Sequence, residues 1–341
     1  MEYSQIKDIL ETLCKSDGTS GAEGNAALRA KEMLEKFMPV HIDRLGNVVG
    51  TKGSGYSILL DAHIDQIGLI VTGVDKYGFV KVAKVGGADL RVLTAAQVTI
   101  HGKEDIFGVV TSVPPHLASD KDEGKVKSFD EITIDIGMSK EQADGIVSPG
   151  DRITFNGPFD CLDGNRIASP SIDDRAGVAA IIRCLQLLGD KETCRLDVMF
   201  SAQEETGGSG AATGAFNSQA DEAIAVDVSF ASAPGVSSEK YASLGKGALI
   251  GYAPSLDYRM SREFSRIAEE KDIPAVPEVM GGRTGTNGDD IQIAGRGIKT
   301  ALISIPIRNM HTAVEVCDLE DIENTAKLMA AYILERSGNH D

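Results

Sequence analysis

The first part of the chain predicts two amphipathic helices. Between residues 3 and 15, apolar side chains recur three or four positions apart, which is the period of a helix with one buried face. The same period predicts a second helix over Ala22–Phe37. Ser20 and Glu23 stand before it with the spacing of a capping box, in which two side chains bond backbone amides at the start of a helix.

A short apolar run, Tyr56–Leu60, predicts a buried strand. Asp61, His63 and Asp65 follow it at alternating positions, so the carboxyl end of this strand presents polar side chains. In open α/β sheets, ligands bind at that edge. We therefore expect part of a functional site here.

The pattern changes between about Val71 and Asp160, where short β-like runs separated by Gly and Pro replace helical periodicity. Strand–helix alternation resumes afterwards. We therefore interpret residues 71–160 as a small all-β barrel domain inserted into an α/β catalytic domain formed by residues 1–70 and 161–341. The strands expected in the insert are Phe79–Val82, Gln97–His101, Phe107–Val113, Glu131–Ile136 and Arg152–Phe155.

The C-terminal half alternates between strands and helices, which predicts a mostly parallel sheet covered by helices on both faces. The expected strands are Leu196–Phe200, Ala223–Val228, Ala248–Tyr252 and Thr300–Ile305. The expected helices are Asp174–Leu188, Ser209–Phe216, Tyr258–Lys271, a short helix near Asp290, and Leu319–Glu335.

Composition narrows the classes of function. At 341 residues the chain exceeds the size at which single hydrophobic cores usually stop growing, which agrees with an inserted domain. The net charge of −17 disfavours nucleic acid and anionic membranes, because both need a cationic face. No stretch reaches the roughly 18 apolar residues of a membrane span, and the N-terminus does not resemble a signal peptide. We therefore expect a cytoplasmic protein with neither a nucleic-acid nor a membrane partner.

Acidic residues and histidines stand at the ends of five predicted strands or in the adjoining loops. Strand ends of one polarity meet at one edge of a doubly wound sheet, so these side chains are expected to form one site. The five cysteines have no CxxC spacing, which argues against a disulfide framework or a thiolate zinc site. Two imidazoles with several carboxylates are the ligand set expected for zinc, cobalt or manganese. The residues are His63, Asp65, Asp173, Asp174, Glu204, Glu205, Asp227 and His311.

Each of these positions also has a structural interpretation when taken alone. His63 and Asp65 share one face of a strand, and such a pair is often purely structural. Asp174 precedes an apolar helix and suits an N-cap, while the adjacent Glu204 and Glu205 suit a solvated acidic loop. Adjacent glutamates also point to different sides, so one can bind metal while the other handles a proton. The structural interpretations fail jointly, because five independent strand ends would carry such residues by accident.

Five segments, in this order along the chain, resemble the metal-site motifs of the tetrahedral (TET) aminopeptidase family, which includes glutamyl and deblocking aminopeptidases. They are DAHIDQIGLIV, SIDDRAG, FSAQEETGGSGA, AIAVDV and IPIRNMHTAVEV. The resemblance extends to residues 45–48 and 108–117, so it covers nearly the whole chain. It implies a zinc-exopeptidase-like α/β fold with an inserted β-domain that serves oligomerisation and substrate access. The family builds homo-oligomers of twelve subunits through that domain.

By motif matching, the resemblance implies two divalent ions per subunit, zinc or cobalt ahead of manganese. Asp173 would bridge both ions. His63 and Asp227 would complete one ligand set, and Glu205 and His311 the other.

The same resemblance implies the catalytic roles. Glu204 takes the general-base position, and Asp65 takes the place behind His63, where a carboxylate orients the imidazole. Water activated between the two ions attacks the first peptide carbonyl, and one ion can hold the free α-amine. The implied function is an aminopeptidase that removes N-terminal residues from short peptides.

Three positions depart from the family's pattern. Gln66 stands where a glutamate is common, Asn165–Ser171 replaces a Gly-Lys-Ala-like lead, and residues 281–290 are more polar and richer in glycine. These departures affect, in turn, the charge near the ion that His63 would bind, access to the site and the substrate pocket. They leave the preference for a substrate side chain open.

Other activities remain open from the residues themselves. A metal-dependent deacylase or amidase of N-acyl amino acids would use the same ions and base, but would engage a carboxylate in place of the amine. An endoglucanase would need two carboxyl groups flanking a sugar ring roughly 5 to 10 Å apart, and adjacent glutamates do not straddle a ring in that way. A non-catalytic metal-binding scaffold is hard to reconcile with the base position at Glu204.

Overall fold

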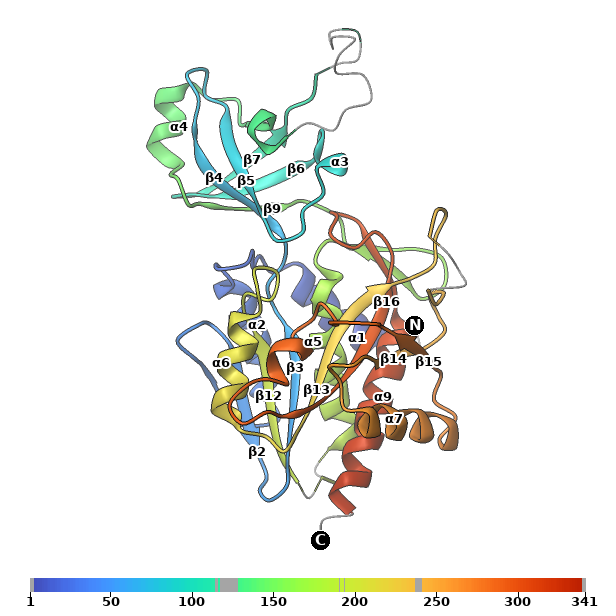
Figure 1. Cartoon of the computed structure of the whole chain (residues 1–341). Coiled ribbons are helices and arrows are strands. Elements are labelled where there is room, and N and C mark those ends of the chain that lie inside the picture. The colour runs from blue at the N-terminus through green and yellow to red at the C-terminus, as the bar shows by residue number, and fades with distance from the viewer. Residues whose placement is uncertain are drawn as a thin grey trace.

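The computed structural model describes residues 3–113, 116, 128–189, 191–192, 194–236 and 241–338. It has two parts, an α/β domain and a smaller β-barrel that stands beyond one edge of the α/β sheet (Figure 1). The family resemblance also covers residues 108–117. Of these, residues 114, 115 and 117 lie outside the described part of the chain. Among the described helices, none combines the length and the apolar character needed to cross a bilayer.

An eight-stranded sheet forms the centre of the α/β domain, in the order β1-β2-β12-β3-β13-β16-β14-β15. The pairs β12–β3, β3–β13, β13–β16 and β14–β15 are parallel, and the remaining three pairs are antiparallel. The predicted mostly parallel sheet is therefore confirmed. The strands are β1 (Val40–Ile42), β2 (Val48–Lys52), β3 (Ser57–His63), β12 (Arg195–Ser201), β13 (Glu222–Phe230), β14 (Ala248–Tyr252), β15 (Ala275–Val279) and β16 (Lys299–Ile307).

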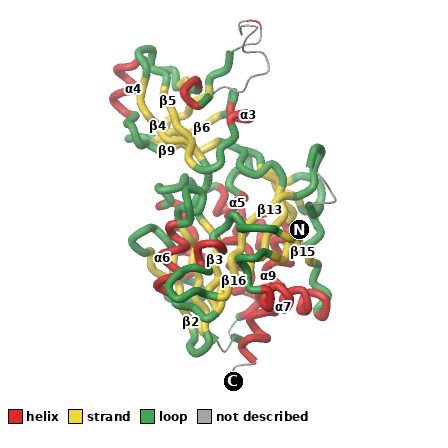
Figure 2. Tube along the Cα trace, in the orientation of Figure 1, coloured by secondary structure: helices red, strands yellow, loops and turns green. Residues whose placement is uncertain are grey.

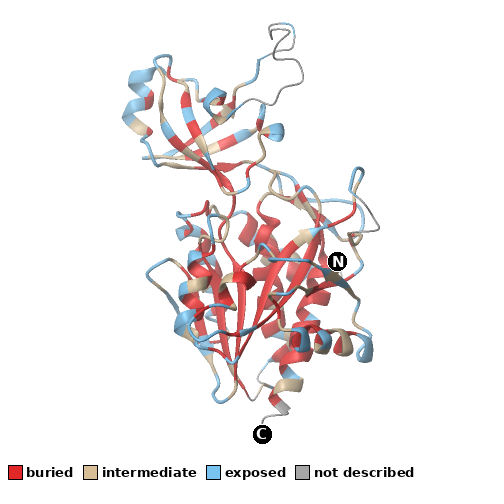
Figure 3. Cartoon of the chain, viewed as in Figure 1, coloured by how far each residue is buried: buried red, intermediate tan, exposed pale blue. Residues whose placement is uncertain are grey.

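Helices cover both faces of this sheet, and the central strands are buried along nearly their whole length (Figure 3). Alternate side chains of β3 enter different cores. Ile58 and Leu60 join a large cluster with helices α1, α2, α5, α7 and α9, whereas Leu59 joins a smaller one with α6 and α8. Burial on both faces explains why these strands are nearly continuous apolar runs. The helices are α1 (Ser4–Cys14), α2 (Gly24–Leu34), α5 (Ile172–Leu188), α6 (Ser209–Ser218), α7 (Tyr258–Glu270), α8 (Gly288–Ile291) and α9 (Leu319–Gly338).

The inserted segment forms a closed six-stranded barrel, in the order β4-β5-β8-β7-β6-β9. All of its strand pairs are antiparallel, and its interior is a separate apolar core. The segment is mostly strand and loop but carries a few short helical pieces that the sequence pattern does not predict (Figure 2). The elements are β4 (Gly68–Val74), β5 (Val80–Val85), α3 (Leu90–Leu93), β6 (Gln97–His101), β7 (Asp105–Val110), η2 (Phe129–Glu131), β8 (Thr133–Asp135), α4 (Lys140–Ile146) and β9 (Arg152–Phe155).

A third, small sheet connects the barrel to the α/β domain. It contains β10 (Asp160–Cys161), β11 (Arg166–Ser169) and β17 (Glu315–Asp318), in that order. Strand β11 leads directly into α5, and β17 leads into α9. This sheet is absent from the expectations drawn from the sequence, because its strands are short and β17 pairs with β11 across a long stretch of chain.

The predicted capping box at the second helix is wrong. Helix α2 begins at Gly24, and its N-cap Glu23 makes no side-chain capping bond. Ser20 Oγ instead lies 2.9 Å from Thr206 Oγ1, and Glu23 Oε1 accepts a hydrogen bond from the Gly21 amide at 2.6 Å. These side chains therefore stabilise the turn before α2 and its contact with the loop after β12, rather than the first turn of the helix.

Candidate metal centre

Five chain segments bring the predicted residues to the carboxyl edge of the parallel strands, on the side that faces the barrel. His63 is the last residue of β3, and Asp227 lies in the second half of β13. Asp173 lies in the first turn of α5. Glu204–Glu205 follows β12, and His311 lies in the loop between β16 and β17. Segments that are far apart in the sequence thus meet where the parallel-sheet pattern predicts.

Asp173 is shared by two groups of three candidate ligands. One group joins His63, Asp173 and Asp227, the other joins Asp173, Glu205 and His311, and within each group the ligand atoms lie within 4.8 Å of one another. The two oxygens of Asp173 face different imidazoles: Oδ1 is 3.0 Å from His63 Nε2, and Oδ2 is 3.1 Å from His311 Nε2. Glu205 Oε1 is 3.4 Å from His311 Nε2, and Asp227 Oδ1 is 4.0 Å from His63 Nε2.

Asp65 connects His63 to the two adjacent glutamates. Its Oδ1 accepts the backbone N–H of Glu204 at 3.0 Å, and its Oδ2 accepts that of Glu205 at 3.1 Å. Its backbone oxygen lies 3.1 Å from His63 Nδ1, so a proton on Nδ1 leaves Nε2 free as a ligand. Glu204 belongs to neither group of three, and its Oε2 lies 3.9 Å from His63 Nε2.

Asp174 is also outside both groups of three. The backbone of Asp173 and Asp174 is not helical, and regular helix begins after them. Asp174 Oδ1 accepts the backbone N–H of Gly177 at 2.9 Å, as an N-cap side chain does, and its Oδ2 accepts that of His63 at 3.2 Å. The helix-cap interpretation therefore holds for Asp174, whose carboxylate also ties α5 to the end of β3.

The electrostatics of the site are dominated by buried carboxylates. Burial and the neighbouring carboxylates raise the pKa of Asp227 well above its ordinary value, and the same causes raise the pKa of Glu204 to about 7. Burial lowers the pKa of both imidazoles, but the carboxylates beside them outweigh it. The pKa of His311 rises to about 11, and that of His63 rises well above its ordinary value. Such a concentration of buried negative charge is stabilised by cations.

Gln66 lies buried beside the site. Its Oε1 accepts a hydrogen bond from Ser171 Oγ at 2.7 Å and lies 3.5 Å from Nη2 of the fully buried Arg175. A neutral amide therefore stands next to this guanidinium, and burial lowers the pKa of Arg175 below its ordinary value.

Asn287 anchors the segment at 281–290, and sequence reasoning did not single it out. This buried side chain donates hydrogen bonds to Asp61 Oδ2 at 2.9 Å and to Ser201 Oγ at 2.7 Å. Asp61 lies in β3, and Ser201 ends β12. The Gly-rich segment is thus fixed to the sheet close to the site, and no local pattern in the sequence signals this role.

Two barrel glycines in the loop after β5 also approach the site. A Cβ atom on Gly87 would lie 2.2 Å from His311 Nδ1, and one on Gly86 would lie 2.9 Å from Glu205 Oε2. The only signal for these contacts in the sequence is the Gly-Gly dipeptide itself. The barrel therefore contributes backbone to the wall beside the second group of candidate ligands, which consists of Asp173, Glu205 and His311.

We expect Gly87→Ala to weaken the binding of one divalent ion by about 10- to 100-fold, the effect typical of disturbing the surroundings of a metal ligand. The new methyl group would overlap the imidazole of His311 and force it to move. Calorimetric titration of metal-free protein measures the affinity. Gly73→Ala is the matched control, because no atom lies within 4 Å of its Cβ position. Equal affinities in the two variants would contradict the assignment of His311 as a ligand.

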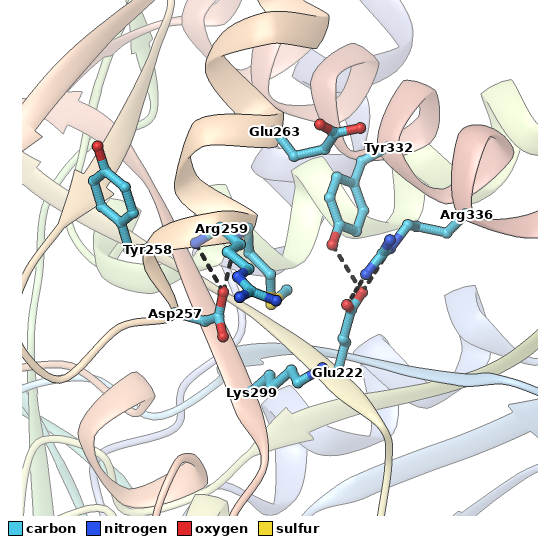
Figure 4. Close-up of a pocket in the computed structure, with 9 residues that line it drawn as sticks. Glu222, Asp257, Tyr258, Arg259, Glu263, Lys299, Tyr332 and Arg336 are labelled. Carbon is cyan, nitrogen blue, oxygen red and sulfur yellow. Dashed lines mark hydrogen bonds and ion pairs between the residues drawn. The ribbon is translucent and has the colours of Figure 1, made fainter. Parts of the chain in front are cut away.

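A cavity at the opposite edge of the sheet has different chemistry. It is lined in part by Glu222 and Lys299, at the starts of β13 and β16, and by Tyr332 and Arg336 from α9 (Figure 4). Glu222 is 1% exposed and accepts hydrogen bonds from Tyr332 Oη at 2.7 Å and from Arg336 Nε at 3.0 Å. None of the lining residues is a histidine, so we place the reactive centre at the carboxyl edge, where two imidazoles and several carboxylates converge.

Comparisons with known proteins find aminopeptidases that are similar to this chain. Residues 46–328 match the family model of the M42 glutamyl aminopeptidases. The chain is 34% identical over 338 residues to the lysyl aminopeptidase of Pyrococcus furiosus, and the match covers 96% of each chain. An aminopeptidase structure from the archaeon Desulfurococcus kamchatkensis has a TM-score of 0.92 at 31% identity, covering 99% of this chain and 97% of that one. The TET1 peptidase of Pyrococcus horikoshii, described as assembling into a tetrahedron or a large octahedral shell, has a TM-score of 0.85 at 31% identity, covering 96% and 99%.

Proposed function

Because the chain belongs to the M42 glutamyl aminopeptidase family, we propose that it removes N-terminal residues from short peptides at a centre of two divalent ions, with Glu204 as the general base. The observation that carries this proposal is the placement of two imidazoles on opposite oxygens of Asp173. Glu204 lies close to one of these imidazoles and outside both ligand groups.

The donor atoms suit ions of the zinc, cobalt or manganese class. His63 and Asp227 would hold one ion with Asp173, and Glu205 and His311 would hold the other with the same aspartate. Bonds of about 2.0 to 2.2 Å place two ligand atoms of one zinc ion roughly 3 to 4 Å apart. The closest donor pairs here lie at 3.0, 3.1 and 3.4 Å. When bound, the ions would supply Lewis acidity to the scissile carbonyl and to the attacking water.

The position of Glu204 supports a role in proton transfer. Its backbone is fixed by Asp65, and its side chain is 17% exposed, so it is held in position yet open to substrate and water. Glu204 Oε2 accepts a proton from the attacking water while the water oxygen bonds to the peptide carbonyl carbon. The same proton then passes to the peptide nitrogen as the C–N bond breaks. The released residue carries the new carboxylate, and the shortened peptide leaves with a free amine.

One assay separates this function from its alternatives. Turnover of aminoacyl-p-nitroanilides is compared with turnover of N-acetylated amino acids and of a soluble cellulose derivative, in metal-free protein and after addition of zinc, cobalt or manganese. We expect activity on free-amine substrates only, and only with metal present. Activity confined to N-acylated substrates would identify a deacylase, and hydrolysis of the cellulose derivative an endoglucanase. Full activity after complete metal removal would overturn the proposed mechanism.

We expect Asp65→Asn to lower kcat by about 10- to 100-fold with a smaller change in KM. The asparagine oxygen can accept only one of the two amides of Glu204 and Glu205, and its NH₂ group repels the other. Glu204, the proposed base, and Glu205, a proposed ligand, therefore lose the carboxylate that holds both of their backbone amides. Steady-state kinetics at saturating metal provide the measurement. Asp197→Asn is a suitable control, because Asp197 is also a buried sheet residue but interacts with Thr51, Arg195 and Ser218, away from the site.

We also propose that the chain forms homo-oligomers, as described for the TET1 peptidase structure to which it is similar. Large apolar side chains on the barrel support this, since Tyr77, Val92 and Phe107 are 68%, 50% and 56% exposed. A dodecamer is the expected assembly. Light scattering coupled to gel filtration should give about twelve times the mass of one chain, and the mass of a monomer would contradict the proposal.

A further inference from the structure

Glu315 accepts hydrogen bonds from the backbones of two candidate ligands at once. Its Oε1 accepts the N–H of His311 at 2.8 Å, and its Oε2 accepts the N–H of Asp173 at 3.0 Å. The side chain is buried, with 1% of the residue exposed. One carboxylate thus joins the loop between β16 and β17 to the first turn of α5.

The small third sheet determines where this carboxylate lies. Glu315 is the first residue of β17 and pairs in register with Ser169, the last residue of β11. Three residues after Ser169 the chain enters α5, so the side chain of Glu315 reaches the start of that helix. Arg308 and Val316 exchange two backbone hydrogen bonds across the base of the His311 loop, at 2.9 and 3.0 Å. The loop and the helix start therefore meet at Glu315.

Both segments contain backbone conformations that need support from outside. Ser171 and His311 each have a φ of 63°, in the left-handed region that residues with a side chain rarely adopt. Neither segment would keep this shape by local preference alone. The carboxylate of Glu315 stabilises both shapes, because it accepts an amide from His311 and from the residue two positions after Ser171.

The arrangement repeats the one at Asp65. In the second ligand group, the backbone N–H of Glu205 is held by Asp65, and those of Asp173 and His311 are held by Glu315. All three members of that group therefore have their amides fixed by a buried carboxylate. A carboxylate suits this task because each oxygen accepts one amide, whereas a glutamine side chain offers one acceptor oxygen and two donors.

We propose that Glu315 is a positioning residue for the second ion, the one that Asp173, Glu205 and His311 would hold. By accepting both amides, Glu315 sets the separation of Asp173 Oδ2 and His311 Nε2, and this separation determines how tightly the ion is bound. This inference rests on the proposed metal-dependent function, and it adds a determinant of metal affinity that touches neither substrate nor metal.

The test is Glu315→Gln, measured as metal binding rather than as activity alone. Metal-free protein is titrated with Co²⁺ and followed by calorimetry and by visible absorption. We expect one of the two ions to bind about 10- to 100-fold more weakly, with the other changed less. Turnover should recover when excess metal is added.

Glu222→Gln is the matched control. Glu222 has the same exposed fraction as Glu315, 1%, and lies at the opposite edge of the sheet, where Tyr332 and Arg336 bond it (Figure 4). This variant removes a buried charge far from the site. It should lower the melting temperature and leave both metal affinities within about twofold of those of the unsubstituted protein.

The outcomes separate the inference from the proposed function. Unchanged affinities in Glu315→Gln, or an equal loss in both variants, would overturn the positioning role. If Glu315→Gln does not fold, hydrogen–deuterium exchange of the unsubstituted, metal-free protein decides the question. The amides of Asp173 and His311 should be protected, and free exchange of either would overturn the inference. If the unsubstituted protein binds no metal and cleaves no free-amine substrate, the proposed function itself fails.

Discussion

Replacing Asp173 by asparagine is expected to weaken the binding of both divalent ions by more than about 100-fold and to remove measurable turnover. Changes around a ligand typically cost 10- to 100-fold in affinity, and this change affects a ligand common to two sites. An asparagine presents an oxygen to only one of the two imidazoles, and its NH₂ group cannot bind a cation. Both ligand groups therefore lose a donor and a negative charge at once.

The environment of Asp173 supports this expectation. Burial raises the pKa of its carboxyl group, but hydrogen bonds with His311 and His63 outweigh burial, and the pKa falls below its ordinary value. Asp173 therefore stays ionised and available as a ligand.

Metal content after dialysis and calorimetric titration measure the effect. Asp227→Asn is the control, because Asp227 belongs to one group only and should weaken one ion while sparing the other. Normal binding of two ions by Asp173→Asn would contradict the shared-ligand assignment.

The convergence of the site could be predicted because it depends on simple geometry. Parallel strands with apolar interiors align their carboxyl ends, so His63, Asp227 and the residues after β12 had to meet. The sequence pattern puts His63 and Asp65 on one face of a strand, but β3 ends at His63, so Asp65 lies in the loop that follows. Its Oδ1 still lies 3.4 Å from His63 Nδ1. The spacing of residues along the chain and the parallel order of the strands thus account for most of the placement of these side chains.

Glu315 and Asn287 could not be predicted in the same way. Glu315 lies in the same segment as His311, yet its contact with Asp173 depends on the pairing of β17 with β11, which no local pattern indicates. Asn287 acts through hydrogen bonds to two strands that precede it by long stretches of chain. Such contacts follow from tertiary packing, and a single polar residue leaves no periodic signal.

The wrong and missing predictions of secondary structure have similar causes. The Ser20–Glu23 spacing matched a capping box, but a tertiary partner, Thr206, took the serine side chain. Strand β15 is not among the strands predicted from the sequence, because Pro277 weakens its strand pattern. It forms the edge strand of the sheet, where a missing N–H is tolerated. In each case a long-range interaction overrode the local preference.

Replacing Glu204 by glutamine is expected to lower kcat by about 10²- to 10⁴-fold, the usual contribution of a general base, while both ions stay bound. Glutamine keeps the size of the side chain, and the bond to Asp65 uses the backbone N–H, which the substitution does not alter. The amide cannot accept the proton of the attacking water, so the chemical step slows. KM should change little, because Glu204 is not expected to anchor the substrate amine.

The neighbouring residue supplies a sharp control, since Glu205→Gln makes the same chemical change one position along the chain. Glu205 belongs to the second ligand group and its Oε1 faces His311, whereas Glu204 belongs to neither group. Glu205→Gln should therefore lose one ion and regain activity at high metal concentration, while Glu204→Gln should keep both ions and stay inactive at any concentration. If both variants lost metal equally, Glu204 would be a ligand, and the proton would need another acceptor.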